Sequence, residues 1–105
     1  MLWYIVSVAV DRARAEEWAA WMADVHIPEV VATGRFEGAW MSPDAARDTE
    51  ARQAWRMVYL VKSQQDFEDY QREDAPALQA DHVRLFGGVA SASREVLPIT
   101  AAFRA

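Results

Sequence analysis

Residues 17–30, EWAAWMADVHIPEV, form the stretch around which the rest of the chain is organised. Trp18 and Met22 recur at helical spacing, so the segment predicts an amphipathic helix. Pro28 disfavours helical geometry in the residue before it, and we expect the helix to kink or restart there. The segment also holds His26, one of two histidines in the chain. It therefore combines a packing face with a first candidate for chemistry.

A weaker copy of this segment recurs in the second half of the chain. The motif Glu17-Trp18-x-x-Trp21 has a counterpart in Asp66-Phe67-x-x-Tyr70, and each motif is followed by a proline, Pro28 or Pro76. Both halves thus combine an acid-aromatic-x-x-aromatic helix with a restart at proline. This repeat favours two similar βαβ halves over a helical bundle or a sandwich.

Four segments with strand character surround the two helices. They are residues 2–10, 36–41, 53–62 and 89–99. The first is apolar on both faces, which is typical of a central strand. The order βαββαβ predicts a ferredoxin-like α+β fold, with an antiparallel sheet and two helices on one face. We expect a single domain over residues 1–105.

Local signals place the helix ends. Asp11 is expected to cap the first helix, and Ser63 is expected to cap a second helix that opens at Gln64. Gly87-Gly88 is expected to end the second helix. Its predicted apolar stripe continues through Leu78, Val83, Leu85 and Phe86.

The composition limits the possible functions. The chain has 105 residues, of which 52% are hydrophobic, with five tryptophans, so an interface or a cavity should take up apolar surface. A net charge of −5 disfavours roles on nucleic acid or at a membrane surface. The absence of cysteine fits a reducing compartment. The short apolar N-terminus reads as a strand, so we expect no signal peptide and a cytoplasmic protein.

The two helical motifs also carry a family resemblance. Trp18-x-x-Trp21-Met22-x-x-x-His26-Ile27-Pro28-Glu29-Val30, together with Ala75-Pro76-Ala77-Leu78-x-x-x-His82-x-x-Leu85-Phe86-Gly87, resembles a family of bacterial domains of unknown function. These domains are similar to the dimeric α/β-barrel superfamily, which includes EthD-like proteins and antibiotic-biosynthesis-type monooxygenases. The resemblance implies a homodimer in which two sheets press together, with a pocket between sheet and helices. It names no reaction, because this fold hosts unrelated functions.

His26 is the strongest candidate for catalysis. Its position beside a helix break allows it to face a cleft, and its ordinary pKa suits proton transfer. Asp24 and Glu29 are the partners within local reach. The alternative is a histidine that stabilises the C-terminal end of a helix and bonds a carbonyl.

His82 is interpreted as a partly buried histidine that closes a helix–sheet contact. A metal site made of His26, His82 and a carboxylate is conceivable, but no histidine spacing typical of metal sites is present, and we predict no metal site and no cofactor.

Strand residues supply the candidates for ligand binding. Trp3, Trp40, Trp55 and Tyr59 would line the pocket or the dimer seam, or belong to the core. Arg56 and Arg94 lie mid-strand, and an arginine that faces a pocket would attract an anionic ligand. We include Arg56 among the candidate ligand-binding residues; a solvated or ion-paired arginine is the alternative.

Two main hypotheses follow. The first is a homodimeric small-molecule-binding or structural module without chemistry of its own. The second is a cofactor-independent enzyme, such as a cyclase, isomerase or monooxygenase, that acts on an apolar aromatic or polyketide-like molecule with His26 as general base. A haem or metal binder is a third, weaker hypothesis.

Overall fold

β1 (Leu2–Asp11) lies inside the sheet between two other strands, as its two apolar faces predicted. The computed structural model describes residues 1–105. After β1 the chain runs through α1 (Arg12–Trp21), the π-helical turn η1 (Met22–His26), α2 (Ile27–Ala32), β2 (Phe36–Pro43), the 3-10 turn η2 (Ala45–Arg47), β3 (Arg52–Val61), α3 (Gln64–Asp69), the π-helical turn η3 (Tyr70–Asp74), α4 (Ala75–Phe86) and β4 (Ala90–Pro98).

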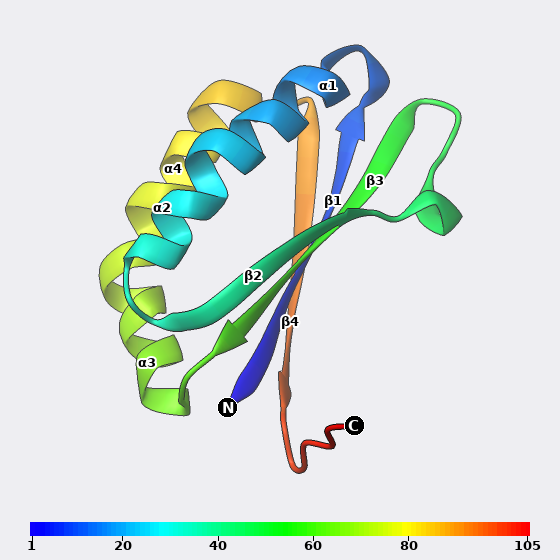
Figure 1. The fold of residues 1–105 in the computed structure, drawn as a ribbon. Helices are drawn as coiled ribbons and strands as arrows, with labels where there is room; N and C mark the ends of the chain where they lie inside the picture. Colours follow the sequence, from blue (N-terminus) through cyan, green and yellow to red (C-terminus); the bar gives the residue numbers. More distant parts are fainter.

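The four strands form one sheet in the order β2-β3-β1-β4, and every neighbouring pair is antiparallel. The helices all lie on one side of this sheet (Figure 1). The arrangement is the predicted ferredoxin-like α+β fold. Strand boundaries differ from the predicted ones by one or two residues. None of the helices has the length and apolarity that crossing a membrane requires.

The two faces of the sheet are covered differently. Tyr4 and Val8 of β1 are buried beneath the helices, whereas Trp3 of the same strand lies on the opposite face. There Trp3 meets Trp40 edge to face, with ring centroids 6.2 Å apart. Trp40 and Leu97, which is paired with Trp3 across the sheet, are 56% and 48% exposed. The face without helices therefore presents large apolar side chains to solvent.

The helices form two helical arms, α1–η1–α2 and α3–η3–α4, and each arm contains a wide turn directly before its proline. The N–H of Ile27 donates to the carbonyl of Met22, five residues earlier, and the N–H of Ala75 donates to that of Tyr70 in the same way. A proline ring clashes with the carbonyl four residues before it, and a widened turn relieves that crowding. The predicted restart at Pro28 is confirmed, because α2 begins at Ile27 with Pro28 in its first turn, and the π-helical turn joins α1 to α2.

These turns define a second alignment of the repeat, shifted by one residue. When η1 is superposed in sequence on η3, Met22 takes the place of Tyr70, and both side chains are buried. The sequence comparison paired Tyr70 with Trp21, which is only half-buried. Trp18 and Phe67, the first aromatic residue of each arm, are both buried. The repeat thus reflects the same pattern of buried residues around the wide turn of each arm.

The predicted caps have different outcomes. Ser63 accepts a hydrogen bond from the backbone N–H of Asp66, as predicted. Asp11 makes no side-chain cap; its carboxylate instead accepts a hydrogen bond of 2.9 Å from Nε of Arg52. The carboxylate of Asp11 is therefore paired with an arginine of the neighbouring strand β3 and not with a backbone N–H of α1.

The apolar stripe of α4 is narrower than predicted. Phe86 is buried and Leu78 is half-buried, but Val83 and Leu85 are 64% and 38% exposed. Residues four apart share one helix face, so the inward line runs from Leu78 through His82 to Phe86. This register brings His82 toward the interior.

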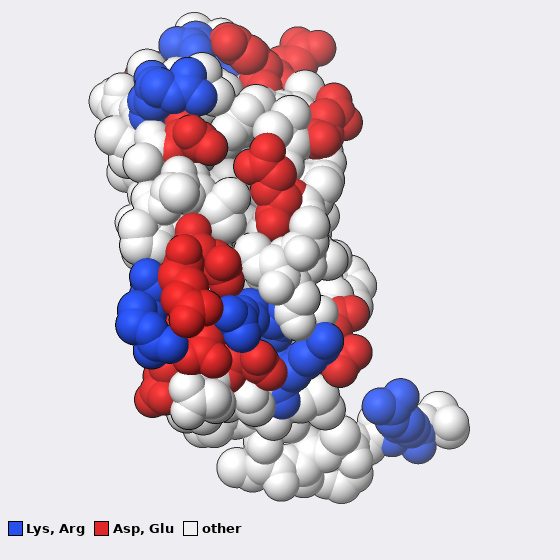
Figure 2. All heavy atoms as spheres, turned by 90° about the vertical axis from the view of Figure 1, so that its left-hand side faces the viewer, with Lys and Arg blue, Asp and Glu red and all other residues white.

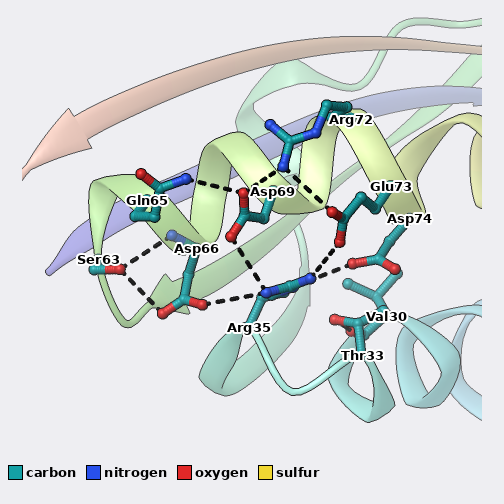
Figure 3. A network of polar contacts seen from close by, with 10 residues as sticks. All are labelled: Val30, Thr33, Arg35, Ser63, Gln65, Asp66, Asp69, Arg72, Glu73 and Asp74. Carbon is teal, nitrogen blue, oxygen red and sulfur yellow. Dashed lines mark hydrogen bonds and ion pairs between the residues drawn. The ribbon is translucent and has the colours of Figure 1, made fainter.

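Arg35, just before β2, ties the two helical arms together. Its guanidinium lies within ion-pair distance of Asp66, Asp69, Glu73 and Asp74 on α3 and η3 (Figure 3), and the shortest contact is 2.8 Å, to Glu73. On the helical side of the molecule, acidic and basic side chains intermingle most densely toward the end where α3 lies (Figure 2). The charges of this region are therefore largely paired with one another.

Candidate functional site

A small cavity lies between the sheet and the two helical arms. Its volume is about 40 Å³, which is room for about two or three water molecules. Apolar side chains of β1, η1, α2 and β4 form part of its wall. The polar side chains that line it are His26, Gln79, His82, Arg94 and the tyrosines Tyr4, Tyr59 and Tyr70. Such a convergence of polar groups in an apolar wall is typical of a ligand site.

His26, at the end of η1, lies in this cavity. Its ring stacks on Trp21, with centroids 5.0 Å apart and an interplanar angle of 28°. Its Nδ1 is buried and has no hydrogen-bond partner. Asp24 and Glu29, the expected local partners, are exposed and do not bond to it. Burial, helped by neighbouring His82, lowers the pKa of His26 to about 4, so this ring is neutral at pH 7.

His82 of α4 shares the cavity with His26, with ring centroids 6.1 Å apart. The buried indole of Trp18 donates a hydrogen bond of 2.9 Å from Nε1 to Nε2 of His82. This bond joins α1 to α4, and His82 also lines the cavity together with sheet residues such as Tyr4 and Arg94. Burial, followed by the charge of Arg94, lowers the pKa of His82.

Three tyrosines line the cavity from the sheet and from η3. Tyr4, Tyr59 and Tyr70 are only 5%, 3% and 3% exposed. The hydroxyls of Tyr59 and Tyr70 make no hydrogen bond within the chain. Burial raises the pKa of both, and it raises the pKa of Tyr4 against the opposing effect of Arg94. All three side chains are therefore protonated phenols at neutral pH.

Arg94 is the cation of the cavity. It lies on the edge strand β4, paired with Val6 of β1, and its side chain is exposed while lining the cavity. It takes part in none of the ion pairs of the chain. Its charge acts to lower the pKa of both histidines and all three tyrosines of the cavity. Arg94 is thus an uncompensated positive charge at the solvent side of the site.

The other candidate ligand-binding residues lie in different places. Tyr59 lines the cavity, whereas Trp55 packs beside Trp18 with ring centroids 5.9 Å apart. Trp3 and Trp40 meet on the face of the sheet without helices. Arg56 lies mid-strand on that same face, 3.7 Å from the carboxylate of Asp44. The cavity therefore unites His26 and Tyr59 but not the remaining four.

Several lining residues, among them Tyr4, Tyr70, Gln79 and Arg94, were not selected from the sequence as site residues. Tyr4 alternates along β1 with Val6 and Val8, so the three side chains share one face of the strand, and this pattern in the sequence indicates the side that the helices cover. The position of Arg94 follows from its pairing with Val6, which the sequence alone does not give. The two histidines are not joined by further metal ligands, since no group of three or more His, Cys, Asp or Glu side chains is placed to hold a metal ion.

Comparison with known sequences gives one family match. A family model described as a domain of unknown function, DUF4286, matches residues 1–100. A search of curated proteins finds no match.

Comparison with solved structures gives many similar folds. An EthD family protein from Bacillus halodurans has a TM-score of 0.68 at 9% identity, over 90% of this chain and 97% of that one. SnoaB, a cofactor-independent oxygenase from Streptomyces nogalater, has a TM-score of 0.66 at 8% identity, over 96% and 95% of the two chains. A dimeric ferredoxin-like protein from an uncultured marine organism has a TM-score of 0.68 at 12% identity, over 100% of both chains. These likenesses establish the fold and confirm the predicted resemblance to EthD-like and monooxygenase-like proteins.

Proposed function

The chain belongs to the DUF4286 family of domains of unknown function, and we propose that it is a homodimeric small-molecule-binding protein, one domain over residues 1–105, with its ligand site in the cavity. The supporting observation is the convergence of unpartnered polar groups. The ring of His26 and the hydroxyls of Tyr59 and Tyr70 line this space, the two hydroxyls have no hydrogen-bond partner in the chain, and Arg94 has no counter-ion. Polar groups without partners that gather around one space favour a ligand that pairs with them.

A fragment titration followed by NMR tests the binding function. Resonances of His26, His82 and Tyr70 are expected to shift with at least one class of small polar fragment. Ala92→Phe should block these shifts, because Ala92 lines the cavity from β4. Ala80→Phe is the matched control, since Ala80 is exposed on α4 and does not line the cavity. A fragment set that leaves all cavity resonances unmoved would refute the proposal.

The homodimer is supported by the apolar face of the sheet without helices. Trp40 and Leu97 are exposed there, and exposed apolar patches of this kind mark protein interfaces. Solved proteins of the same fold include ones described as dimeric. Sedimentation should show a dimer that Trp40→Asp dissociates. Val83→Asp should leave it intact, because Val83 is exposed on α4 instead. A clean monomer at micromolar concentration would contradict the proposed dimer.

A cofactor-independent enzyme with His26 as general base is the second candidate. It is favoured by one observation: His26 lines the cavity and is neutral at pH 7, as a base must be. A pKa of about 4 makes it a weak base, because proton transfer is most effective near the working pH. A base also needs a nitrogen lone pair directed into the cavity. The nitrogen chemical shifts of the His26 ring test this requirement directly.

A further inference from the structure

The hydrogen-bonding character of the cavity follows from the protonation of its two histidines. A neutral imidazole carries its proton on one nitrogen and presents a lone pair on the other. Both His26 and His82 are neutral at pH 7, because burial lowers the pKa of each. The contacts of the rings then determine which nitrogen of each holds the proton.

Trp18 fixes the proton of His82. An indole N–H is only a donor, and Trp18 donates to Nε2 of His82. That nitrogen must therefore hold the lone pair, and the proton lies on Nδ1. His82 consequently carries one N–H donor, on Nδ1, and has no free acceptor nitrogen. Trp18 is thus a positioning residue for the tautomer of His82.

Burial fixes the proton of His26. Its Nδ1 is sealed from solvent and from hydrogen-bond partners. A buried N–H without a partner is rarer and more costly in proteins than an under-satisfied acceptor. The proton of His26 is therefore assigned to Nε2, the other ring nitrogen. His26 then also carries an N–H donor, and its ring lines the cavity.

The remaining polar groups reinforce this donor character. The hydroxyls of Tyr59 and Tyr70 are protonated and free to donate. Arg94 adds a guanidinium, which has donors and no acceptor and matches the geometry of a carboxylate. Only the amide of Gln79 brings an obligate acceptor. The cavity is thus rich in donors, carries one net positive side chain, and has space for about three heavy atoms in its 40 Å³.

We infer that this cavity binds the carboxylate head of a small organic acid, with Arg94 at the mouth and the ring N–H groups of His26 and His82 inside. The inference rests on the proposed binding function and names its ligand class. A carboxylate has the three heavy atoms that the space admits, and it accepts from every donor around it. The rest of the acid would extend past exposed Arg94 toward solvent.

Acetate and acetamide form the decisive pair of probes, because they share a shape and differ in charge. NMR titrations at constant ionic strength and pH 7 should show acetate binding about tenfold or more tightly than acetamide, as expected for hydrogen bonds to a charged group. Arg94→Gln should weaken acetate by a similar factor. Arg84→Gln removes the same charge from the exposed side of α4 and should leave acetate binding unchanged. Inorganic phosphate, a bulkier oxyanion, should bind more weakly than acetate.

The tautomers are tested on the unaltered protein by the nitrogen chemical shifts of the two rings. The expected result is a proton on Nε2 of His26 and on Nδ1 of His82, with both N–H groups shifted by acetate. Trp18→Phe should release His82 into a mixture of tautomers and weaken acetate binding. A lone pair on Nε2 of His26 would overturn the donor assignment and favour the general base instead.

The outcomes separate the two proposals. Neutral fragments that occupy the cavity while acetate does not would overturn the carboxylate inference and leave the binding function standing. Equal binding of acetate and acetamide, equal effects of Arg94→Gln and Arg84→Gln, or phosphate binding as tightly as acetate would also overturn the carboxylate inference. No response of the cavity to any compound would remove both proposals.

Discussion

The two helical arms share a backbone plan and differ in the residue that ends the wide turn. In the first arm, α1–η1–α2, that residue is His26, which lines the cavity with a buried, unpartnered Nδ1. In the second arm, α3–η3–α4, it is Asp74, which accepts a hydrogen bond of 3.4 Å from Nε of Arg35. One arm places a neutral group against an internal space, and the other satisfies a charge at the surface.

This difference shows that a repeated packing plan does not imply repeated chemistry. The buried first residues of the turns, Met22 and Tyr70, both line the cavity. Only the second arm also supplies a phenol at that position, and only the first supplies a histidine at the end of the turn. The site is therefore asymmetric although its scaffold is built from two similar arms.

Loss of the first aromatic residue should affect both arms most strongly and about equally. Trp18→Ala and Phe67→Ala each remove a buried ring and should lower the free energy of unfolding by about 3–5 kcal/mol. Denaturant unfolding measures the change, and Trp18→Phe and Phe67→Leu are milder variants if the alanine variants do not fold. A loss below about 1 kcal/mol at either position would contradict the equivalence of the arms.

Acidification should destabilise the protein through His26 of the first arm and, in the same direction, through His82 of the second arm. The folded pKa of His26 is about 4, below its ordinary value of 6.5, so between these values the unfolded chain binds more protons. The contribution of His26 to the free energy of unfolding is fully present above pH 6.5 and is lost as the pH falls toward 4. Allowing for partial solvent screening, we expect about 1–2 kcal/mol of loss between pH 7 and pH 5. His26→Gln should lose less over this range; an identical pH dependence would refute the assignment.

Disruption of the surface charges should produce a smaller, salt-dependent effect through the second arm. Arg35→Ala removes the common partner of four carboxylates on α3 and η3, so mutual repulsion of these groups should lower the thermal midpoint. The deficit should shrink in high salt because surface charges are screened. Arg14→Ala, which removes a single pair with Glu17, is the control. A deficit that is independent of salt would indicate lost packing instead.

The smallest effects should appear in the pKa of His26 itself. Asp81 of the second arm raises this pKa, so Asp81→Asn should lower it further. Asp24 of the first arm is nearer in sequence but exposed and does not contact the ring, so Asp24→Asn should leave it unchanged. NMR titration of the ring protons measures both. The reverse ranking would mean that sequence neighbours control this histidine.

The fold was accessible from the sequence because its signals are local. The apolar patterns of the strands, the cap at Ser63 and the helix end at Gly87 can each be recognised from a few neighbouring residues. The order of strands and helices along the chain is then compatible with only a few topologies. The wide turns were not accessible, because a π-helical turn differs from a kink only in which carbonyl accepts the N–H of Ile27. Sequence marks the proline but not the way in which the helix accommodates it.

The candidate site was accessible only in part, because it depends on tertiary contacts. His26 was predicted as a site residue because it lies just before Pro28. His82 was interpreted as structural, since nothing local shows that Trp18 will meet its Nε2 across two helices. Arg94 was predicted to attract an anionic ligand if it faced a pocket, but its inward register follows only from pairing with Val6. The grouping of donors thus appears only once strands and helices are assembled.

The stack of Trp21 on His26 has an optical consequence. The two rings lie nearly face to face at 5.0 Å, so protonation of the imidazole, or an anion bound beside it, changes the electric field across the indole. The excited state of an indole is strongly dipolar, and its emission follows that field. The protein therefore carries an intrinsic fluorescent gauge of its cavity, which a variant with Trp21 as the sole tryptophan would isolate.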